Sequence, residues 1–169
     1  LLGGVGSDQI YGGDGNDQIL GDDSTVFSFF GNNNDIILAG DGDDIVLASF
    51  GTDQIYGNAG NDIIDGQQGN DLIYGGQGND TASGGGGNDQ MFGDKGDDLL
   101  LAGAGDDEVS GGEGNDDING NQGNDVINGN QGDDTVRGGQ GNDIVRGGAG
   151  NDQVFGDKGE DTLIPDAGD

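Results

Sequence analysis

The sequence repeats with a fixed period of nine residues. Residues 138–146 read GGQGNDIVR, and residues 147–155 read GGAGNDQVF. Divided into nines from Gly3, the chain gives 18 complete units that end at residue 164, with no insertion between them. A fixed short period is typical of a solenoid, in which each repeat is one structural unit stacked on its neighbours.

The nine positions of a unit differ in composition. The first is Gly in 14 of 18 units, the fourth is Gly in 16, the sixth is Asp in 17 and the eighth is apolar in 17. The exceptions are Phe30, Ala39, Ala48 and Ala102 at position one, Ser24 and Asn33 at position four, Val26 at position six and Ser28 at position eight. The bias is therefore positional, which a low-complexity tract would not show.

This pattern predicts the conformation of each unit. Glycine at positions one and four indicates a backbone that adopts positive φ or packs closely on itself, and Asn or Asp at position five tolerates the same conformations. The last three residues alternate about the apolar eighth position, as a strand does. We therefore expect a six-residue turn and a three-residue strand in each unit. Two units would make one coil of a parallel β-roll, an all-β fold of about nine coils.

The charge of the chain restricts its partners. The sequence has 34 acidic and 4 basic residues, a net charge of −30 and 42 glycines, and lacks cysteine and histidine. Few apolar residues and a high net charge are typical of disorder, so from composition alone the chain either stays disordered or binds something that stabilises it. A polyanion repels nucleic acid, and no apolar run is long enough for membrane insertion. Cations are the expected partners.

The aspartates of position six point to the identity of the cation. Stacked coils place them in columns, where unpaired carboxylates repel one another. Carboxylates and main-chain carbonyls suit a hard cation with a flexible coordination shell, which favours calcium. Magnesium prefers small octahedral sites, and zinc prefers nitrogen or sulfur ligands.

The units resemble the RTX (repeats-in-toxin) nonapeptides, Gly-Gly-x-Gly-x-Asp-x-apolar-x, from residue 3 to residue 164. The resemblance implies a parallel β-roll that holds calcium between turns through the sixth Asp and main-chain carbonyls. It also implies export by type I secretion. The ligands implied are Asp8, Asp17, Asp35, Asp44, Asp53, Asp62, Asp71, Asp80, Asp89, Asp98, Asp107, Asp116, Asp125, Asp134, Asp143, Asp152 and Asp161.

A count of gaps between units two apart predicts the amount of calcium bound. Leaving out the gaps that touch Val26 gives about 14 ions, or +28 against the net charge of −30. We therefore expect a chain that is disordered without calcium and folded with it. Such a chain would fold after export, where calcium is plentiful, so the expected location is extracellular or the cell surface. A cytosolic calcium buffer is the alternative.

Two features depart from the plain repeat. Unit 21–29, GDDSTVFSF, is degenerate, and its Phe27 and Phe29, with Phe30 directly after them, form either a locally packed coil or an apolar patch for a partner. Outward positions seven and nine are mostly apolar in the first half of the chain. They include Leu20, Ile36, Leu38, Ile45, Leu47, Ile63, Leu72 and Tyr74, with Tyr56 and Phe92 nearby. This favours lateral packing of the N-terminal half on a second copy or a flanking domain.

The sequence favours a structural role. Without histidine or cysteine, and with the other acids scattered, we expect no enzyme activity in this segment. The length of the array favours a single β-roll segment, 1–169, of a secreted or surface structural protein such as a filament, surface layer or adhesin-like rod. The chain is expected to be part of a longer protein. The alternative is the C-terminal calcium-binding secretion and folding domain of a secreted protease, lipase or toxin.

Overall fold

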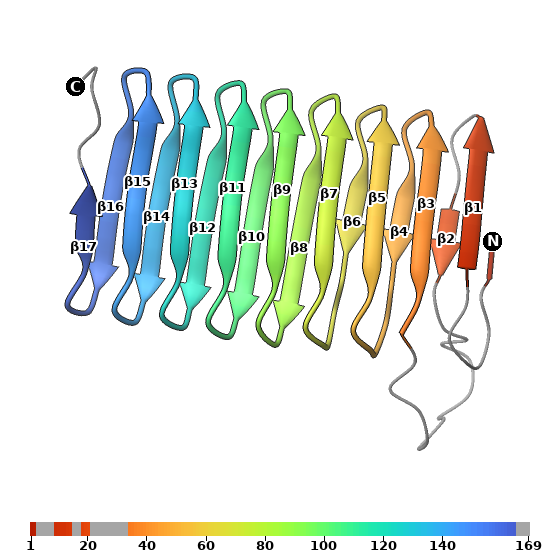
Figure 1. The fold of residues 1–169 in the computed structure, drawn as a ribbon, viewed down its shortest axis with the longest axis horizontal. Coiled ribbons are helices and arrows are strands. Elements are labelled where there is room, and N and C mark those ends of the chain that lie inside the picture. The colour runs from red at the N-terminus through yellow and green to blue at the C-terminus, as the bar shows by residue number, and fades with distance from the viewer. Residues whose placement is uncertain (3–8, 15–17, 21–33, 165–169) are drawn as a thin grey trace.

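The fold is a flattened coil of two parallel β-sheets (Figure 1). It is seen in a computed structural model that describes residues 1–2, 9–14, 18–20 and 34–164. One sheet has nine strands: β1 (Gln9–Asp14), β3 (Ile36–Asp41), β5 (Gln54–Ala59), β7 (Leu72–Gln77), β9 (Gln90–Lys95), β11 (Glu108–Glu113), β13 (Val126–Gln131), β15 (Ile144–Ala149) and β17 (Thr162–Ile164). The other has eight: β2 (Gln18–Leu20), β4 (Ile45–Leu47), β6 (Ile63–Asp65), β8 (Thr81–Gly86), β10 (Leu99–Ala104), β12 (Asp117–Gln122), β14 (Thr135–Gln140) and β16 (Gln153–Lys158).

The strand register follows the sequence period. In β5 and β7, Ile55 pairs with Ile73 and Tyr56 with Tyr74, each 18 residues apart. The chain alternates between the sheets, so two nonapeptides complete one turn of the solenoid. The described residues build about 7 turns of about 18 residues each. The predicted all-β parallel β-roll is therefore confirmed.

The division of each unit into turn and strand was predicted wrongly. Strand β5 covers positions seven to nine of one unit and one to three of the next, leaving only Gly60, Asn61 and Asp62 for the turn. Most strands are thus twice the expected length, because the glycine-rich segment also pairs, as Asn58 does with Gly76. Positive φ falls at positions two and four, as at Asn58 (77°) and Gly60 (139°).

The register changes at the N-terminal end. Ile10 pairs with Ile37, and Ile19 pairs with Val46, so the offset here is 27 residues instead of 18. The pairing therefore passes over one nonapeptide, which corrects the prediction of about nine coils. Unit 21–29 lacks the fourth-position Gly, the sixth-position Asp and the apolar eighth residue of a regular unit. The alternatives for Phe27, Phe29 and Phe30 concern residues outside the described part of the chain.

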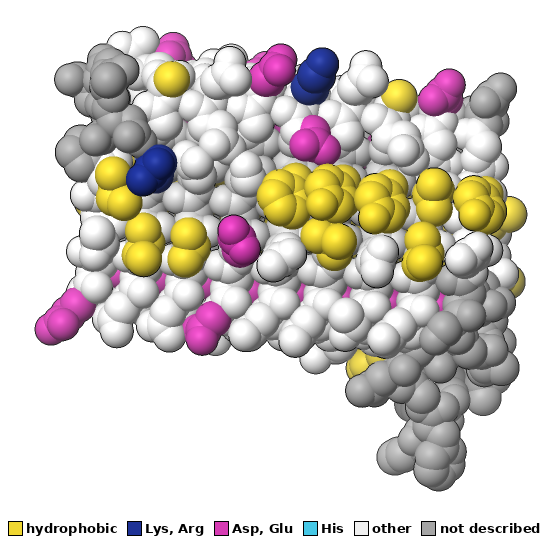
Figure 2. Space-filling view, viewed as in Figure 1, with side chains coloured by type: hydrophobic (Ala, Val, Ile, Leu, Met, Phe, Trp, Pro, Cys, Tyr) yellow, Lys and Arg dark blue, Asp and Glu magenta, His cyan; other side chains and the backbone are white. Residues whose placement is uncertain are grey.

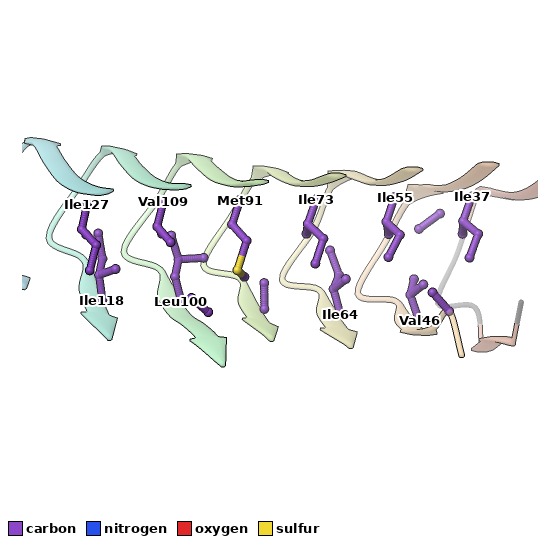
Figure 3. Packing of buried hydrophobic residues seen from close by; sticks show 14 of the residues in the cluster. Ile37, Val46, Ile55, Ile64, Ile73, Met91, Leu100, Val109, Ile118 and Ile127 are labelled. Atoms are coloured by element: carbon purple, nitrogen blue, oxygen red, sulfur yellow. The ribbon is translucent and has the colours of Figure 1, made fainter. Parts of the chain in front are cut away.

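The core is a double row of eighth-position side chains between the sheets. Ile37, Ile55 and Ile73 of one sheet face Val46 and Ile64 of the other (Figure 3). The predicted filling of the gap is confirmed from Ile10 to Val145, and it ends at Leu163, which is 47% exposed. Within the described residues, no helix is long and apolar enough to cross a membrane.

Candidate metal centre

Each tight turn places its aspartate immediately before the following strand, as Asp62 precedes β6, where its side chain reaches the preceding coil. The turn Gly60-Asn61-Asp62 begins with a glycine at a φ of 139°. A Cβ on Gly60 would overlap the carbonyl oxygen of Gly42 in the preceding coil. Only glycine satisfies both constraints, so the fourth position fixes the close stacking that brings the aspartates into register.

The aspartates form two columns of hydrogen bonds. The Oδ1 atom of Asp53 accepts the backbone N–H of Asp35 at 2.7 Å, and the Oδ1 of Asp71 accepts that of Asp53 at 2.9 Å. The same bond joins 13 pairs of aspartates 18 residues apart, from Asp35 to Asp161. The Oδ1 atom of each of these carboxylates is therefore occupied by a backbone hydrogen bond.

The second carboxylate oxygen is buried without a protein partner. Within the described residues, no hydrogen bond reaches the Oδ2 atoms of Asp62, Asp71, Asp80, Asp89, Asp98, Asp107, Asp116, Asp125, Asp134 and Asp143. A buried ionised oxygen with no partner is costly unless a cation or a proton compensates it. The repetition of this feature along both columns is what a line of metal sites requires.

The electrostatics agree with this interpretation. Burial raises the pKa of Asp71 and Asp98 from 3.8 to about 7, although a backbone N–H donated to each carboxylate opposes the shift. Neighbouring carboxylates of the column raise the pKa of Asp98 further. These carboxylates therefore hold their negative charge poorly in the absence of a counter-ion, and a bound cation would remove the cost.

Where a unit begins with glycine, that glycine leaves a small space beside the Oδ2 atom of its own aspartate. A Cβ on Gly66 would lie 2.5 Å from Asp71 Oδ2 and 2.8 Å from the carbonyl oxygen of Gly84 in the next coil. A side-chain oxygen and a main-chain oxygen thus face the same space from adjacent coils. Calcium binds oxygen ligands at about 2.3–2.6 Å and accepts carbonyls and carboxylates together. The donor set fits this ion.

Main-chain oxygens are essential to such a site. Among the described residues, no group of three or more Asp, Glu, His or Cys side chains could hold a metal. The columns offer one carboxylate per coil on each side, and turn carbonyls must complete the coordination. Calcium would neutralise the column and join adjacent coils through these oxygens.

The structure describes 15 of the 17 predicted ligands, from Asp35 to Asp161. It brings all of these into the two columns, while Asp8, Asp17 and Val26 lie outside the described residues. That the aspartates bind calcium stays a prediction. The gap count behind the 14 ions assumed a constant 18-residue offset, which the 27-residue register at the N-terminal end contradicts. The described aspartates alone give 13 gaps, one for each hydrogen-bonded pair.

Sequence reasoning missed the role of position five. Asn79 accepts the backbone N–H of Asp97 through Oδ1 at 3.0 Å, and its own N–H donates to Asn61 Oδ1 at 2.8 Å. This second ladder runs opposite to the first, since each side chain here accepts from the following coil. The frequency of Asn and Asp at position five could have indicated this ladder, but by itself it indicates only tolerance of the turn conformation.

Comparison with known families agrees with the geometry. The chain matches the model of the RTX calcium-binding nonapeptide repeat over residues 1–24, 31–55, 47–82, 65–100, 83–118, 92–127, 110–145 and 128–163. The matches pass over residues 25–30, within and beside the degenerate unit. No curated protein matches the chain. Since the matched ranges cover nearly the whole sequence, the chain belongs to the family of RTX calcium-binding nonapeptide repeats.

Proposed function

We propose that this segment is a calcium-folded β-roll of a secreted or surface-exposed structural protein, such as a filament, surface layer or adhesin-like rod. The observation that carries the proposal is the column of buried Oδ2 atoms, most of which face the same space as a carbonyl oxygen of the next coil, as Asp71 Oδ2 does with the carbonyl of Gly84. The core is small and the net charge of −30 opposes folding, so calcium bound between the coils would supply the missing stabilisation. The position-six aspartates from Asp35 to Asp161 would act as ligands.

Calcium dependence also supports a location outside the cell. RTX repeats are typical of secreted proteins. Calcium modules that work outside cells bind with dissociation constants of about 10⁻⁴–10⁻³ M, well above cytosolic calcium. The chain would stay unfolded during export and become rigid afterwards. We assign the segment no catalytic role, because its buried aspartates hold the backbone of adjacent coils.

A row of side chains on the nine-stranded sheet supports a lateral contact. Ninth-position residues Tyr11, Leu38, Tyr56, Tyr74 and Phe92 form one line across the strands (Figure 2). The rings of Tyr56 and Tyr74 stack with centroids 5.2 Å apart, and those of Tyr74 and Phe92 at 4.8 Å. The last ring of the row, Tyr11, is 63% exposed. We propose that this aromatic row packs on a second copy of the chain.

Sedimentation velocity across a calcium titration tests both proposals together. The expected result is a shift from a slow, expanded species to a compact one, followed by assembly as the concentration rises. The double variant Y56S/Y74S should stay compact but monomeric, whereas the control V126S/I144S, on the same sheet away from the row, should assemble. A compact wild-type monomer at every concentration would contradict self-association and favour the tail of a secreted enzyme or toxin.

A further inference from the structure

Three described units begin with alanine instead of glycine: Ala39, Ala48 and Ala102. All three side chains are fully buried. The first position is the one at which glycine leaves space beside the carboxylate of the same unit. These alanines therefore lie in the candidate metal centres as well as in the core.

The neighbours of Ala102 show what its methyl group must meet. A Cβ on Gly93 would overlap Asp98 Oδ2, and a Cβ on Gly111 would overlap Asp116 Oδ2. At Ala102 the methyl group is present, and the aspartate of that unit is Asp107. Hence the space that a cation could share between Asp107 Oδ2 and the next coil is reduced at this unit alone among the units from 93 to 119.

Asp107 cannot easily move away from the methyl group. It is 3% exposed, and its Oδ1 accepts the backbone N–H of Asp89 at 2.8 Å. Its Oδ2 has no hydrogen-bond partner in the described part of the chain. Rotation of the carboxylate away from Ala102 would break the hydrogen bond from Asp89. Asp107 therefore cannot both keep this hydrogen bond and move its Oδ2 away from the methyl group.

We propose that Ala102 weakens the single calcium site built on Asp107, so that the array contains sites of two strengths. The effect is confined to one site, because the carbonyl oxygen of Ala102 still lies 2.6 Å from the Cβ position of Gly84, beside Asp89. Ala39 and Ala48 occupy the same position ahead of Asp44 and Asp53. The inference rests on the proposed role of the aspartates as ligands.

Calcium binding to the variant A102G, measured by isothermal titration calorimetry, tests the inference. Removing the methyl group should move one ion per chain from the weak to the tight class. The control A104G changes an exposed alanine of the same strand, β10, and carries a similar backbone entropy cost. An unchanged number of tight ions in A102G, or an equal gain in A104G, would overturn the inference.

A second pair of variants separates this inference from the proposal on which it rests. G111A should lose one tight ion, whereas G86A, at a third position where only the side chain of Gln68 is near, should lose none. The double variant A102G/D107N should lose the ion gained by A102G. If the gained ion persists in the double variant, Asp107 is not its ligand. That outcome would contradict the proposed role of the aspartates as ligands, independently of any effect of Ala102.

Discussion

The backbone N–H of Asp80 donates to Oδ1 of Asp98 at 2.7 Å, so the side chain of one coil holds the turn of the coil before it. The other oxygen of Asp98 is buried without a protein partner in the described part of the chain. A single carboxylate thus has two separable functions, a structural hydrogen bond and a charge available to a cation.

Replacing Asp98 by asparagine separates these functions. D98N keeps an Oδ1 acceptor for Asp80 but removes the buried charge. We expect D98N to keep this hydrogen bond in the calcium-loaded coil and calcium affinity to fall. D98A should lose both the hydrogen bond and the charge, with a further loss of stability of about 1–3 kcal/mol from the unpaired N–H. Chemical denaturation in saturating calcium measures the loss of stability, and a calcium titration measures the loss of affinity. Equal calcium affinity in D98N and the wild type would contradict the proposed ligand role.

Two adjacent leucines test the two-row core. Leu100 is fully buried between the sheets, whereas Leu99, its neighbour in β10, is 37% exposed. We expect L100A to lower the free energy of unfolding of the calcium-loaded protein by about 2–5 kcal/mol, because a buried leucine leaves a cavity. L99A should cost much less. Comparable losses in urea denaturation of the two variants would show that the inward row is not the core.

The second ladder can be tested at Asn79. N79A removes the acceptor of the Asp97 N–H and should cost about 0.5–2 kcal/mol, as the loss of a capping side chain does. N79D keeps an acceptor at the same place, as Asp133 does for Asn151, and should cost less. Thermal melting in calcium would compare the two variants. Equal losses would indicate that the hydrogen bond contributes little.

The raised pKa values set the pH dependence of the calcium-free form. The pKa of Asp89 rises to about 7 and that of Asp116 to about 6 in the folded chain, chiefly through burial, against 3.8 when unfolded. Between these values the folded state binds more protons, so stability is full below about pH 4 and falls as the pH rises toward 7. Circular dichroism in chelator should therefore show more β-structure at pH 4 than at pH 7.5. The reverse trend would contradict the buried, unpaired columns.

Calcium should reverse this trend, because protons and calcium compete for the same oxygens. Calcium affinity is therefore expected to weaken as the pH falls from 7.5 to 5. Calorimetric titrations at these two pH values would measure the change, and proton release on binding near pH 7 would accompany it. Affinity that is independent of pH would indicate ligands other than the buried carboxylates.

The sequence predicted the fold because one residue type or class dominates positions one, four, six and eight of the repeat. Eighth-position residues such as Ile55 and Ile73 fixed the inward row, and the period of nine gave the 18-residue coil. The strand length was missed because glycine at position one suggests the start of a turn, whereas the residues at positions two and three pair with the next coil. The glycine at position one is needed for space, because a Cβ on Gly66 would lie against Asp71 Oδ2. The positive φ is adopted by the next residue, Gln67.

The register change could not be read from the period. Unit 21–29 keeps the length of nine, so only the pairing of Ile19 with Val46 shows that one nonapeptide is passed over. The columns of aspartates were predictable from the sixth position. The sequence could not predict that Oδ1 accepts a backbone N–H while Oδ2 has no protein partner, because this depends on the direction in which each turn faces its neighbour.

The most direct test of the account is circular dichroism of the segment at pH 7.5, first in chelator and then across a calcium titration, with bound calcium measured in parallel. The account predicts that β-structure appears only as calcium binds, with about one ion for each of the 13 described gaps between aspartates. An identical β-sheet spectrum in chelator and in millimolar calcium would contradict it.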